Sequence, residues 1–467
     1  EKDEFSEWYV QILQKAELIE YTKVSGSYIL RPRAYAIWEM VQKYLDAKLK
    51  ADGVKNAYFP LLIPESLLSR EKEHIKGFNP EVAWVTHSGT TKLTEKLAIR
   101  PTSETIMYPA YCKWIRSWRD LPLRINQWNN AVRWEFKNPV PFIRSREFLW
   151  QEGHSAFSTK KEAEKEAKKI LDFYEEAYKE IFGIPVIKGV KTEKEKFAGA
   201  DYTLTVEAFL PSGKSAQAAT SHHLGQNFAK AFNIKFKDKD EKEKFVFQNS
   251  WGMSTRSIGI VVMMHSDDKG LVVSPRASEI QIIIIPIFSN NKEKRQVSRE
   301  AEKIKAKLTK LGLRVEIDNR NFNPGFKFND WEMKGIPLRV EIGPRDIKKK
   351  QVMIARRDTG EKKEIKLTKL KEIEKILEDI HSSLYKKAEK YFKDNTINAK
   401  TIGEIIPAIK ARKLVKTEWC SSQECEDWIK TKTEGAGIVC IIDEKAKSKC
   451  AYCGKKSKYK VYVAKSY

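Results

Sequence analysis

The sequence predicts an α+β protein whose 467 residues form three domains. The first sign is a change of composition after Glu279, where residues 280–288 form the apolar run IQIIIIPIF. Such a run is too short to cross a membrane and is typical of a buried strand that opens a new core. The second sign is that five of the six cysteines lie from Cys420 onward. We therefore expect domains at residues 1–278, 279–391 and 392–467.

The charge of the chain indicates a polyanionic partner. There are 87 Lys and Arg against 63 Asp and Glu, a formal net charge of +24, and nucleic acid is the first candidate for such a surplus. No stretch approaches the roughly 20 apolar residues of a membrane span. The start, EKDEFSEWYV, has neither the basic segment nor the apolar run of a signal peptide. We expect a cytoplasmic protein with no membrane partner.

Two helices are expected near the start of the chain. Residues 5–21 carry apolar side chains at helical spacing, and residues 34–49 form a clearer amphipathic helix that Gly53 ends. Residues 54–64, VKNAYFPLLIP, follow as a strand-like segment, and the strand in it is expected to stop at Pro60. That proline is either a simple strand terminator at a sheet edge or the end of a longer helix–strand unit.

Residues 131–154 form the most unusual segment, two predicted strands joined by a loop with Pro139 and Pro141. Arg133 and Glu135 share one face of the first strand. The matching face of the second strand carries charged and aromatic side chains, namely Arg146, Phe148, Trp150, Glu152 and His154. Burying such a face as plain core is unfavourable, because each charge would need a partner. The same combination of charged and aromatic side chains suits a planar base beside a phosphate. The alternative is an exposed edge strand with solvated charges.

Three further segments contain candidate binding residues. Thr102, Ser103 and Glu104 follow Pro101, where the hydroxyls could either cap a helix or hold a ligand. Thr159 and Glu162 form a capping box for a helix up to residue 182. Residues 197–210 and 215–228 alternate like strands, and the second of them carries Gln217, Thr220 and His222. A single histidine is more often structural than a ligand contact.

The segment WGMSTRSIG, residues 251–259, places Arg256 and three hydroxyls between Gly252 and Gly259. Small residues beside one arginine allow a phosphate to approach closely, although the pattern is weak alone.

Alternating helices and strands from residue 280 to about Tyr391 predict a small α/β unit. Residues 345–371 contain eleven Lys and Arg against four Asp and Glu. Such a run is either a solvated face or a contact for an RNA backbone.

The C-terminal region contains two cysteine pairs, CSSQEC and CAYC, formed by Cys420, Cys425, Cys450 and Cys453. Paired thiols at these gaps predict a tetrahedral zinc site. Two disulfides are the alternative, but they need an oxidising compartment. Cys112 and Cys440 are predicted to be structural.

Taken together and in order, these segments resemble the class II aminoacyl-tRNA synthetases, and specifically the eukaryotic and archaeal type of prolyl-tRNA synthetase. The unit ending at Pro60 is similar to motif 1, residues 132–154 to motif 2 and GMSTRSIG to motif 3. The resemblance implies a class II antiparallel-sheet catalytic domain, an α/β anticodon-binding domain and a small zinc-binding C-terminal domain. The cofactors implied are ATP, Mg²⁺ and structural Zn²⁺.

The resemblance also implies a role for individual residues. Arg133, Arg256 and Glu104 would be catalytic. ATP would contact Arg133, Glu135, Arg144, Ser145, Phe148, Gln217, Thr220, Ser254 and Arg256, with Gln217 near Mg²⁺. Proline would contact Thr102, Ser103, Glu104, Arg133, Trp150, Glu152, Phe197, His222 and Trp251. The terminal residue, Tyr467, would lie near the bound substrates.

The function implied is ATP-dependent activation of L-proline and its transfer to tRNA(Pro) by a homodimer. Two alternatives remain: a nonenzymatic RNA-binding regulator with a synthetase-like fold, and a synthetase of the same subclass for another amino acid. The presence of both motif arginines and Glu104 favours an enzyme.

Overall fold

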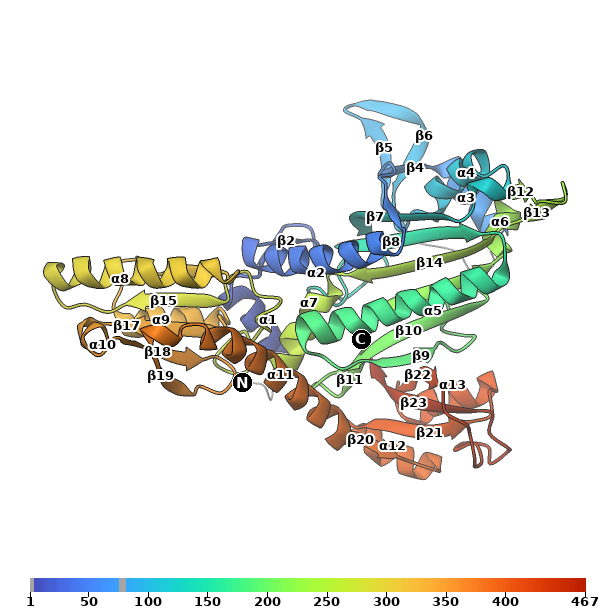
Figure 1. The fold of residues 1–467 in the computed structure, drawn as a ribbon. Helices are drawn as coiled ribbons and strands as arrows, with labels where there is room; N and C mark the ends of the chain where they lie inside the picture. The colour runs from blue at the N-terminus through green and yellow to red at the C-terminus, as the bar shows by residue number, and fades with distance from the viewer. Residues whose placement is uncertain (1–3, 75–80) are drawn as a thin grey trace.

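The computed structural model describes residues 4–74 and 81–467, and two sheets dominate it (Figure 1). The larger has eleven strands in the order β20-β21-β23-β22-β9-β10-β11-β14-β8-β7-β3, and the smaller has five in the order β16-β15-β17-β18-β19. Helices and sheets are mixed as predicted, so the predicted α+β class is confirmed. No helix in the described ranges is both long enough and apolar enough to cross a membrane.

The N-terminal helix is shorter than the periodicity predicts. Helix α1 spans Phe5–Lys15, and residues expected in its last turns form strand β1 (Ile19–Tyr21), paired with β2 (Tyr28–Leu30). Glu17 has a φ of 59°, which a continuing right-handed helix cannot accommodate. The predicted helix over residues 5–21 is therefore wrong beyond Lys15, because Leu18 and Ile19 are buried through the turn and hairpin.

The predicted helix over residues 34–49 is confirmed as α2 (Pro32–Ala51), but residues 54–64 do not form one strand. Two short pieces, β3 (Lys55–Asn56) and β4 (Leu62–Pro64), join different sheets, with Pro60 in the link between them. The segment therefore turns from the large sheet to a three-stranded one. The elements that follow are α3 (Glu65–His74), β5 (Trp84–Ser88), β6 (Thr91–Ile99) and α4 (Glu104–Trp114).

Six antiparallel strands form the centre of the large sheet: β7 (Leu123–Val132), β8 (Glu147–Phe157), β9 (Ile187–Val190), β10 (Tyr202–Phe209), β11 (Lys214–Gly225) and β14 (Phe247–Ser254). Helix α5 (Lys160–Ala177) begins at the predicted Thr159–Glu162 capping box, and a π-helical turn, Tyr178–Phe182, extends it. Helix α7 (Arg256–His265) is buried behind the sheet. A short helix and a hairpin complete this part: α6 (Asn227–Ala231), β12 (Lys235–Lys237) and β13 (Glu243–Phe245).

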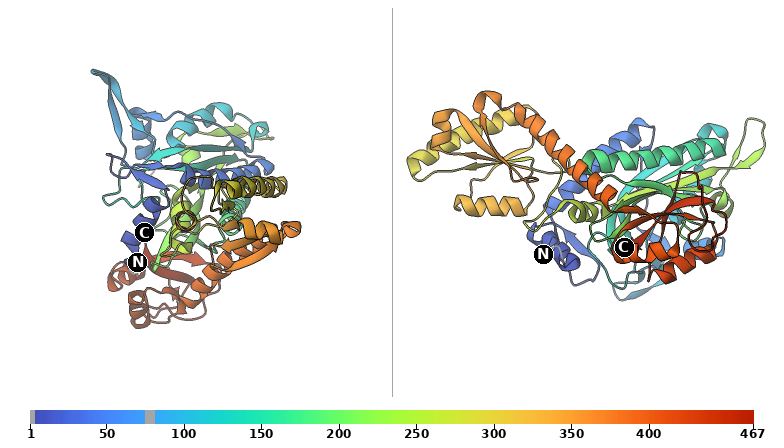
Figure 2. Two further views of the ribbon diagram at one scale, coloured as in Figure 1. Left: turned by 90° about the vertical axis from the view of Figure 1, so that its left-hand side faces the viewer. Right: turned by 90° about the horizontal axis from the view of Figure 1, so that it is seen from below.

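The five-stranded sheet forms a separate layer at one end of the molecule (Figure 2). Its strands are β15 (Ile282–Pro286), β16 (Val315–Ile317), β17 (Leu338–Ile342), β18 (Gln351–Arg356) and β19 (Lys362–Lys366), and its helices are α8 (Asn291–Lys310), α9 (Pro324–Met333), α10 (Pro344–Lys349) and α11 (Glu372–Asp394). Strand β15 is parallel to both neighbours and fully buried. A strand covered on both faces is apolar at every position, which accounts for the IIII run.

The last strands of the chain continue the sheet of the first part. After β20 (Thr396–Asn398) come α12 (Ile402–Lys410), β21 (Leu414–Trp419), α13 (Gln423–Lys432), β22 (Gly437–Ile442) and β23 (Tyr459–Ser466). Strand β22 pairs with β9 at Ile441 and Val190, and β23 pairs with β11. At this junction a Cβ on Gly189 would lie 2.6 Å from the Ile441 carbonyl oxygen, so only glycine permits the approach.

Candidate active site

A cavity of about 420 Å³ opens on the face of the large sheet, within the size range of small-molecule sites. Strands β8, β11 and β14 form its floor, and the start of α4 and the loops after β7 and β9 form its walls. Fifteen of the residues predicted from the sequence line it: Thr102, Glu104, Arg133, Glu135, Ser145, Phe148, Trp150, Glu152, Phe197, Gln217, Thr220, His222, Trp251, Ser254 and Arg256.

Two predicted site residues do not line this cavity. Ser103 is fully buried behind it, where its hydroxyl bonds to Glu152. No hydroxyl caps α4, although Ser103 occupies the N-cap position. Arg144 is exposed on the loop between β7 and β8, with its guanidinium 5.9 Å from the centre of the Phe136 ring. Its assignment to ATP stays a prediction.

The two motif arginines are held by backbone carbonyls. Arg256 donates from Nε to Ile143 (3.0 Å) and from Nη1 to Gln217 (3.1 Å). Burial, and then the charge of Arg133, lower the pKa of Arg256 from its ordinary value. Within residues 4–74 and 81–467 neither Arg133 nor Arg256 forms an ion pair with a carboxylate, and two such cations lining one cavity favour an anionic ligand.

Arg133 is oriented by an acceptor and by two aromatic rings. Its Nε donates to the carbonyl of Pro101 (3.0 Å), and its guanidinium lies 5.3 Å from the ring centres of both Phe148 and Trp150. These distances are within cation–π range. The aromatic face predicted for this strand thus supports an arginine as well as lining the cavity.

The predicted strand over residues 131–135 is wrong at its end. Strand β7 stops at Val132, so Arg133 and Glu135 enter the cavity from the loop that follows. Arg146 also leaves the predicted face: its side chain donates to the carbonyls of Ser25 and Phe136. Contacts with residues 22–27, which are distant in sequence, therefore decide the direction of the Arg146 side chain in place of the strand periodicity. The predicted strand over residues 197–210 likewise begins only at Tyr202.

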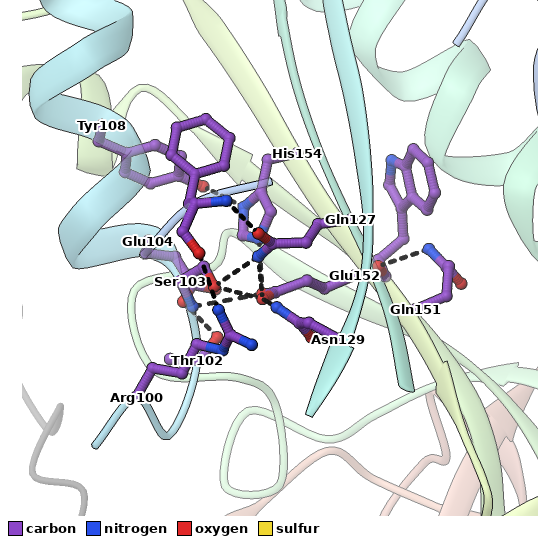
Figure 3. A network of polar contacts seen from close by, with 12 residues as sticks. Arg100, Thr102, Ser103, Glu104, Tyr108, Gln127, Asn129, Gln151, Glu152 and His154 are labelled. Carbon is purple, nitrogen blue, oxygen red and sulfur yellow. Dashed lines mark hydrogen bonds and ion pairs between the residues drawn. The ribbon is translucent and has the colours of Figure 1, made fainter. Parts of the chain in front are cut away.

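A buried network connects the start of α4 to strands β7 and β8 (Figure 3). The Glu152 carboxylate accepts hydrogen bonds from the backbone N–H and hydroxyl of Ser103 and from Gln127 (3.2 Å) and Asn129 (3.0 Å). His154 Nε2 lies 3.0 Å from the same carboxylate, and Nδ1 lies 3.0 Å from the Tyr108 hydroxyl. A network with this many buried hydrogen bonds favours one arrangement of its groups.

The pKa values of the ionisable groups in this network are shifted in different directions. Burial alone raises the pKa of Glu152, but hydrogen bonds, led by that of His154, lower it overall. Burial lowers the pKa of His154, but Glu152 and the charge of Glu104 more than offset this and raise it. Burial raises the pKa of Glu104, against the opposing charge of His154. Glu104 therefore favours a cationic ligand, which would stabilise its ionised form.

His222 is the neutral member of the site. Its Nδ1 lies 2.9 Å from the Thr203 hydroxyl and its Nε2 lies 3.0 Å from the Thr220 hydroxyl. Burial, followed by the charge of Arg133, lowers the pKa of His222 to about 3. The Phe197 ring packs against it with 4.7 Å between ring centres. This side of the cavity is thus an uncharged aromatic wall.

Trp251 owes its position to a glycine on the neighbouring strand. Gly153 is its direct partner in the β8–β14 pairing, and a Cβ there would lie 2.1 Å from the indole ring. Any other residue at position 153 would displace Trp251. The pattern of residues 150–154, with glycine between two charged positions, is thereby explained.

Several supporting residues were not predicted. Gln127, Asn129 and Tyr108 hold the Glu152–His154 pair, and Thr203 orients His222. The amide-rich run NQWNN in β7 was a visible signal, since a buried strand seldom carries three asparagines and a glutamine without partners for them.

The four predicted zinc ligands come together in the C-terminal segment. The sulfur atoms of Cys420 and Cys425 are 3.5 Å apart, those of Cys453 and Cys420 are 3.7 Å apart, and all four thiols lie within 4.8 Å of one another. Tetrahedral zinc with Zn–S bonds of about 2.3 Å places sulfurs about 3.8 Å apart. The thiols fit that metal, and the disulfide alternative is not observed among the six cysteines, which are all free.

Comparison with known families agrees with this geometry. Residues 85–265 match the tRNA synthetase class II core domain for G, H, P, S and T. Residues 281–377 match an anticodon binding domain, and residues 402–467 match the C-terminal domain of prolyl-tRNA synthetase.

Full-length relatives extend the likeness over the whole chain. A cytoplasmic proline–tRNA ligase of Arabidopsis thaliana is 48% identical over 100% of this chain and 90% of its own length. A putative proline–tRNA ligase of Saccharomyces cerevisiae and a bifunctional glutamate/proline–tRNA ligase of Mus musculus are each 49% identical, over 91% and 92% of this chain. The chain spans 64% of the yeast protein and 29% of the mouse protein.

Proposed function

Because the chain belongs to the prolyl-tRNA synthetases, a family of class II aminoacyl-tRNA synthetases, we propose that it activates L-proline with ATP and transfers it to tRNA(Pro). One observation carries the proposal. A single cavity contains two arginines, Arg133 and Arg256, which form no ion pair with a carboxylate among the described residues, together with the buried carboxylate of Glu104. An amino acid beside a nucleotide triphosphate requires both kinds of charge.

Proline recognition is assigned to the end of the cavity at α4. The Glu104 carboxylate, which accepts a hydrogen bond from the Thr102 hydroxyl, would pair with the charged secondary amine of proline. Trp150, Phe197, His222 and Trp251 would enclose the ring. Since His222 is neutral, it adds no charge that would repel the amine. Ser103, from behind the cavity, and Glu152, which lines it, would hold the start of α4 in place.

ATP is assigned to the arginines and hydroxyls. Arg133 would bridge the proline carboxylate and the α-phosphate, while Arg256 and Arg144 would hold the outer phosphates. Phe148 would stack on adenine. The hydroxyls of Ser145, Thr220 and Ser254 would contact the nucleotide or its metal.

Activation then needs no general base, because the proline carboxylate is ionised at neutral pH. Its oxygen attacks the α-phosphorus, and the bond to pyrophosphate breaks, with the arginines stabilising the charge that develops. Glu135 and Gln217 offer the oxygen ligands that Mg²⁺ prefers, and the ion would neutralise phosphate charge when bound. A hydroxyl of the terminal ribose of tRNA then attacks the prolyl carbonyl, and AMP leaves.

The segment from 279 to 391 is proposed to bind the anticodon stem-loop. Next to β16 it presents two aromatic rings, Phe322 and Phe326, which are 52% and 47% exposed, with 4.5 Å between their centres. The guanidinium of Arg320 lies 5.6 Å from the Phe322 ring. Exposed rings beside a cation suit unpaired RNA bases.

The remaining parts of the proposal concern assembly and location. We infer a homodimer through the unit that ends at Pro60, where Tyr58 is 71% exposed and Tyr35 is also exposed. The segment from 392 to 467 is proposed to hold one structural zinc ion, since four thiolates leave no position for substrate. The cytoplasm is the proposed location, as in the name of the Arabidopsis relative.

Exchange of pyrophosphate into ATP, measured with each of the twenty amino acids, tests the proposal. Proline alone should support strong exchange. Exchange with a different amino acid would identify another synthetase of the subclass, and none with any amino acid would favour a nonenzymatic regulator.

A further inference from the structure

The loop between β9 and β10 contacts both the cavity and the C-terminal strands. Residues 191–201 of this loop supply Glu195, Phe197 and Ala198 to the cavity lining. Loops without regular structure need other contacts to hold a binding residue in place. The contacts of this loop with helix α13 therefore bear on the site.

A buried hydrogen bond joins the loop to α13. The Thr192 hydroxyl donates to Glu426 Oε1 over 2.8 Å, and the two residues are 234 positions apart in the sequence. Thr192 is 1% exposed and Glu426 is 5% exposed. A buried carboxylate needs hydrogen-bond partners, because its transfer from water is unfavourable unless such partners compensate. In the described part of the chain, the Thr192 hydroxyl is the hydrogen-bond donor to this carboxylate.

Two ion pairs flank this bond. Lys191 donates to the carbonyl of Val439 (2.9 Å) and pairs with buried Glu207 (2.5 Å). Lys194 pairs with Asp427, the residue after Glu426. The C-terminal segment thus holds the base of the loop at three residues, Lys191, Thr192 and Lys194, of which Thr192 is the most buried.

Backbone hydrogen bonds connect Thr192 to the cavity wall. Its carbonyl accepts from the N–H groups of Glu195 (3.1 Å) and Lys196 (2.9 Å), which closes a turn. The next residue, Phe197, donates its N–H to the Thr203 hydroxyl (3.0 Å) and packs against His222. The position of Thr192 therefore sets where the turn delivers the Phe197 ring.

We propose that Glu426 is a positioning residue for the amino-acid pocket, acting through Thr192 on the turn that carries Phe197. The inference rests on the proposed function, because it names proline as the ligand whose binding Glu426 supports. Glu426 directly follows Cys425 at the start of α13, so the thiol cluster orients the helical turn that presents it. In this way a residue of the C-terminal segment completes a pocket formed by the first part of the chain.

Substitutions in the full-length protein test this role with two measurements. Glu426→Ala and Thr192→Val each remove the hydrogen bond. Hydrogen–deuterium exchange at residues 195–197 should become about tenfold faster, as expected for one lost buried hydrogen bond. The KM for proline should rise about five- to tenfold, while the KM for ATP stays within about twofold.

Two matched variants separate positioning from a general loss of structure. Glu426→Gln keeps an oxygen that can accept from Thr192, so it should behave like the wild-type protein. Glu424→Ala removes an exposed carboxylate from the same helical turn and should change neither measurement. If Glu426→Ala does not fold, Thr192→Val, which conserves shape, decides the question.

The proposal would be overturned if a folded Thr192→Val protein showed unchanged hydrogen–deuterium exchange at residues 195–197 and an unchanged KM for proline. A Glu426→Gln protein as impaired as Glu426→Ala would also overturn it, since the acceptor oxygen would then not be the cause. Failure of the proposed function is distinguishable: the wild-type protein would show no proline-dependent pyrophosphate exchange, whereas deuterium exchange at the turn would still respond to Thr192→Val.

Discussion

Replacing Arg256 by alanine should separate catalysis from stability. The wild-type guanidinium is half-buried and donates to the carbonyls of Ile143 and Gln217. Alanine leaves both acceptors without this donor and removes a cation from the cavity. The first effect should lower the free energy of unfolding, and the second should slow proline activation.

The two magnitudes can be worked out separately. A buried acceptor that loses its donor costs about 1–3 kcal/mol, and water from the adjoining cavity can replace part of the loss, so we expect roughly 2 kcal/mol in total for Arg256→Ala. Loss of one group that stabilises transition-state charge costs about 3–4 kcal/mol. This corresponds to a decrease of roughly 100- to 1000-fold in proline-dependent pyrophosphate exchange.

Arg314→Ala is the matched control. Arg314 also donates to two backbone carbonyls, those of Ser278 (2.9 Å) and Pro275 (2.7 Å), and burial likewise lowers its pKa. It does not line the cavity. The control should lose a similar amount of stability in thermal or urea unfolding, yet keep its exchange rate per folded molecule.

The reasoning would be refuted if Arg256→Ala exchanged pyrophosphate at a near-normal rate. It would equally be refuted if Arg314→Ala and Arg256→Ala lost activity in the same proportion, because stability would then explain both.

Four other predictions concern pH, metal, RNA and assembly. The pKa of His154 is raised in the fold by Glu152 and Glu104, despite the opposing effect of burial. The ion pair of His154 therefore stabilises the protein fully at pH values below the pKa of about 6.5 that His154 has in the unfolded chain, and this stabilisation is lost as the pH rises through the pKa of His154 in the folded protein. The melting temperature should therefore fall more between about pH 6 and about pH 9 in the wild type than in His154→Gln, and parallel curves would contradict the pairing. Cys425→Ser should lower both the zinc content, measured by elemental analysis, and the melting temperature; unchanged metal content would exclude this ligand. Phe326→Ala should weaken tRNA charging by about 1–3 kcal/mol, or roughly 5- to 150-fold, and leave pyrophosphate exchange intact; equal loss of both would argue against an anticodon contact. Light scattering should give twice the mass of one chain, and a fully active monomer would refute the dimer.

The local elements were predictable where one pattern dominates. The alternation of β8 placed Phe148, Trp150 and Glu152 on one face, and all three line the cavity. The capping box at Thr159 correctly predicted where α5 begins. Errors occurred where a distant contact overrides the pattern: Arg146 binds the carbonyl of Ser25 and so leaves the predicted face.

The buried carboxylates show a different limit. Glu152 appeared from the sequence as a ligand contact, but in the structure its carboxylate is also the acceptor for donors from α4, β7 and β8. Which donors surround it depends on strand register and on the angle at which α4 meets the sheet. Neither quantity is encoded within any short stretch of the chain.

The sequence by itself determined the types of element, the order of the motifs and the cysteine quartet, because each depends on periodicity or spacing within a few tens of residues. The resemblance of those motifs to a known family, and not periodicity, supplied many of the residues that line the cavity. The tertiary structure alone decided that β22 and β23 extend the sheet of the first part, and that Glu426 meets Thr192. Those contacts join residues more than 200 positions apart. Their energy comes from burial and hydrogen bonds that exist only after the sheet has assembled.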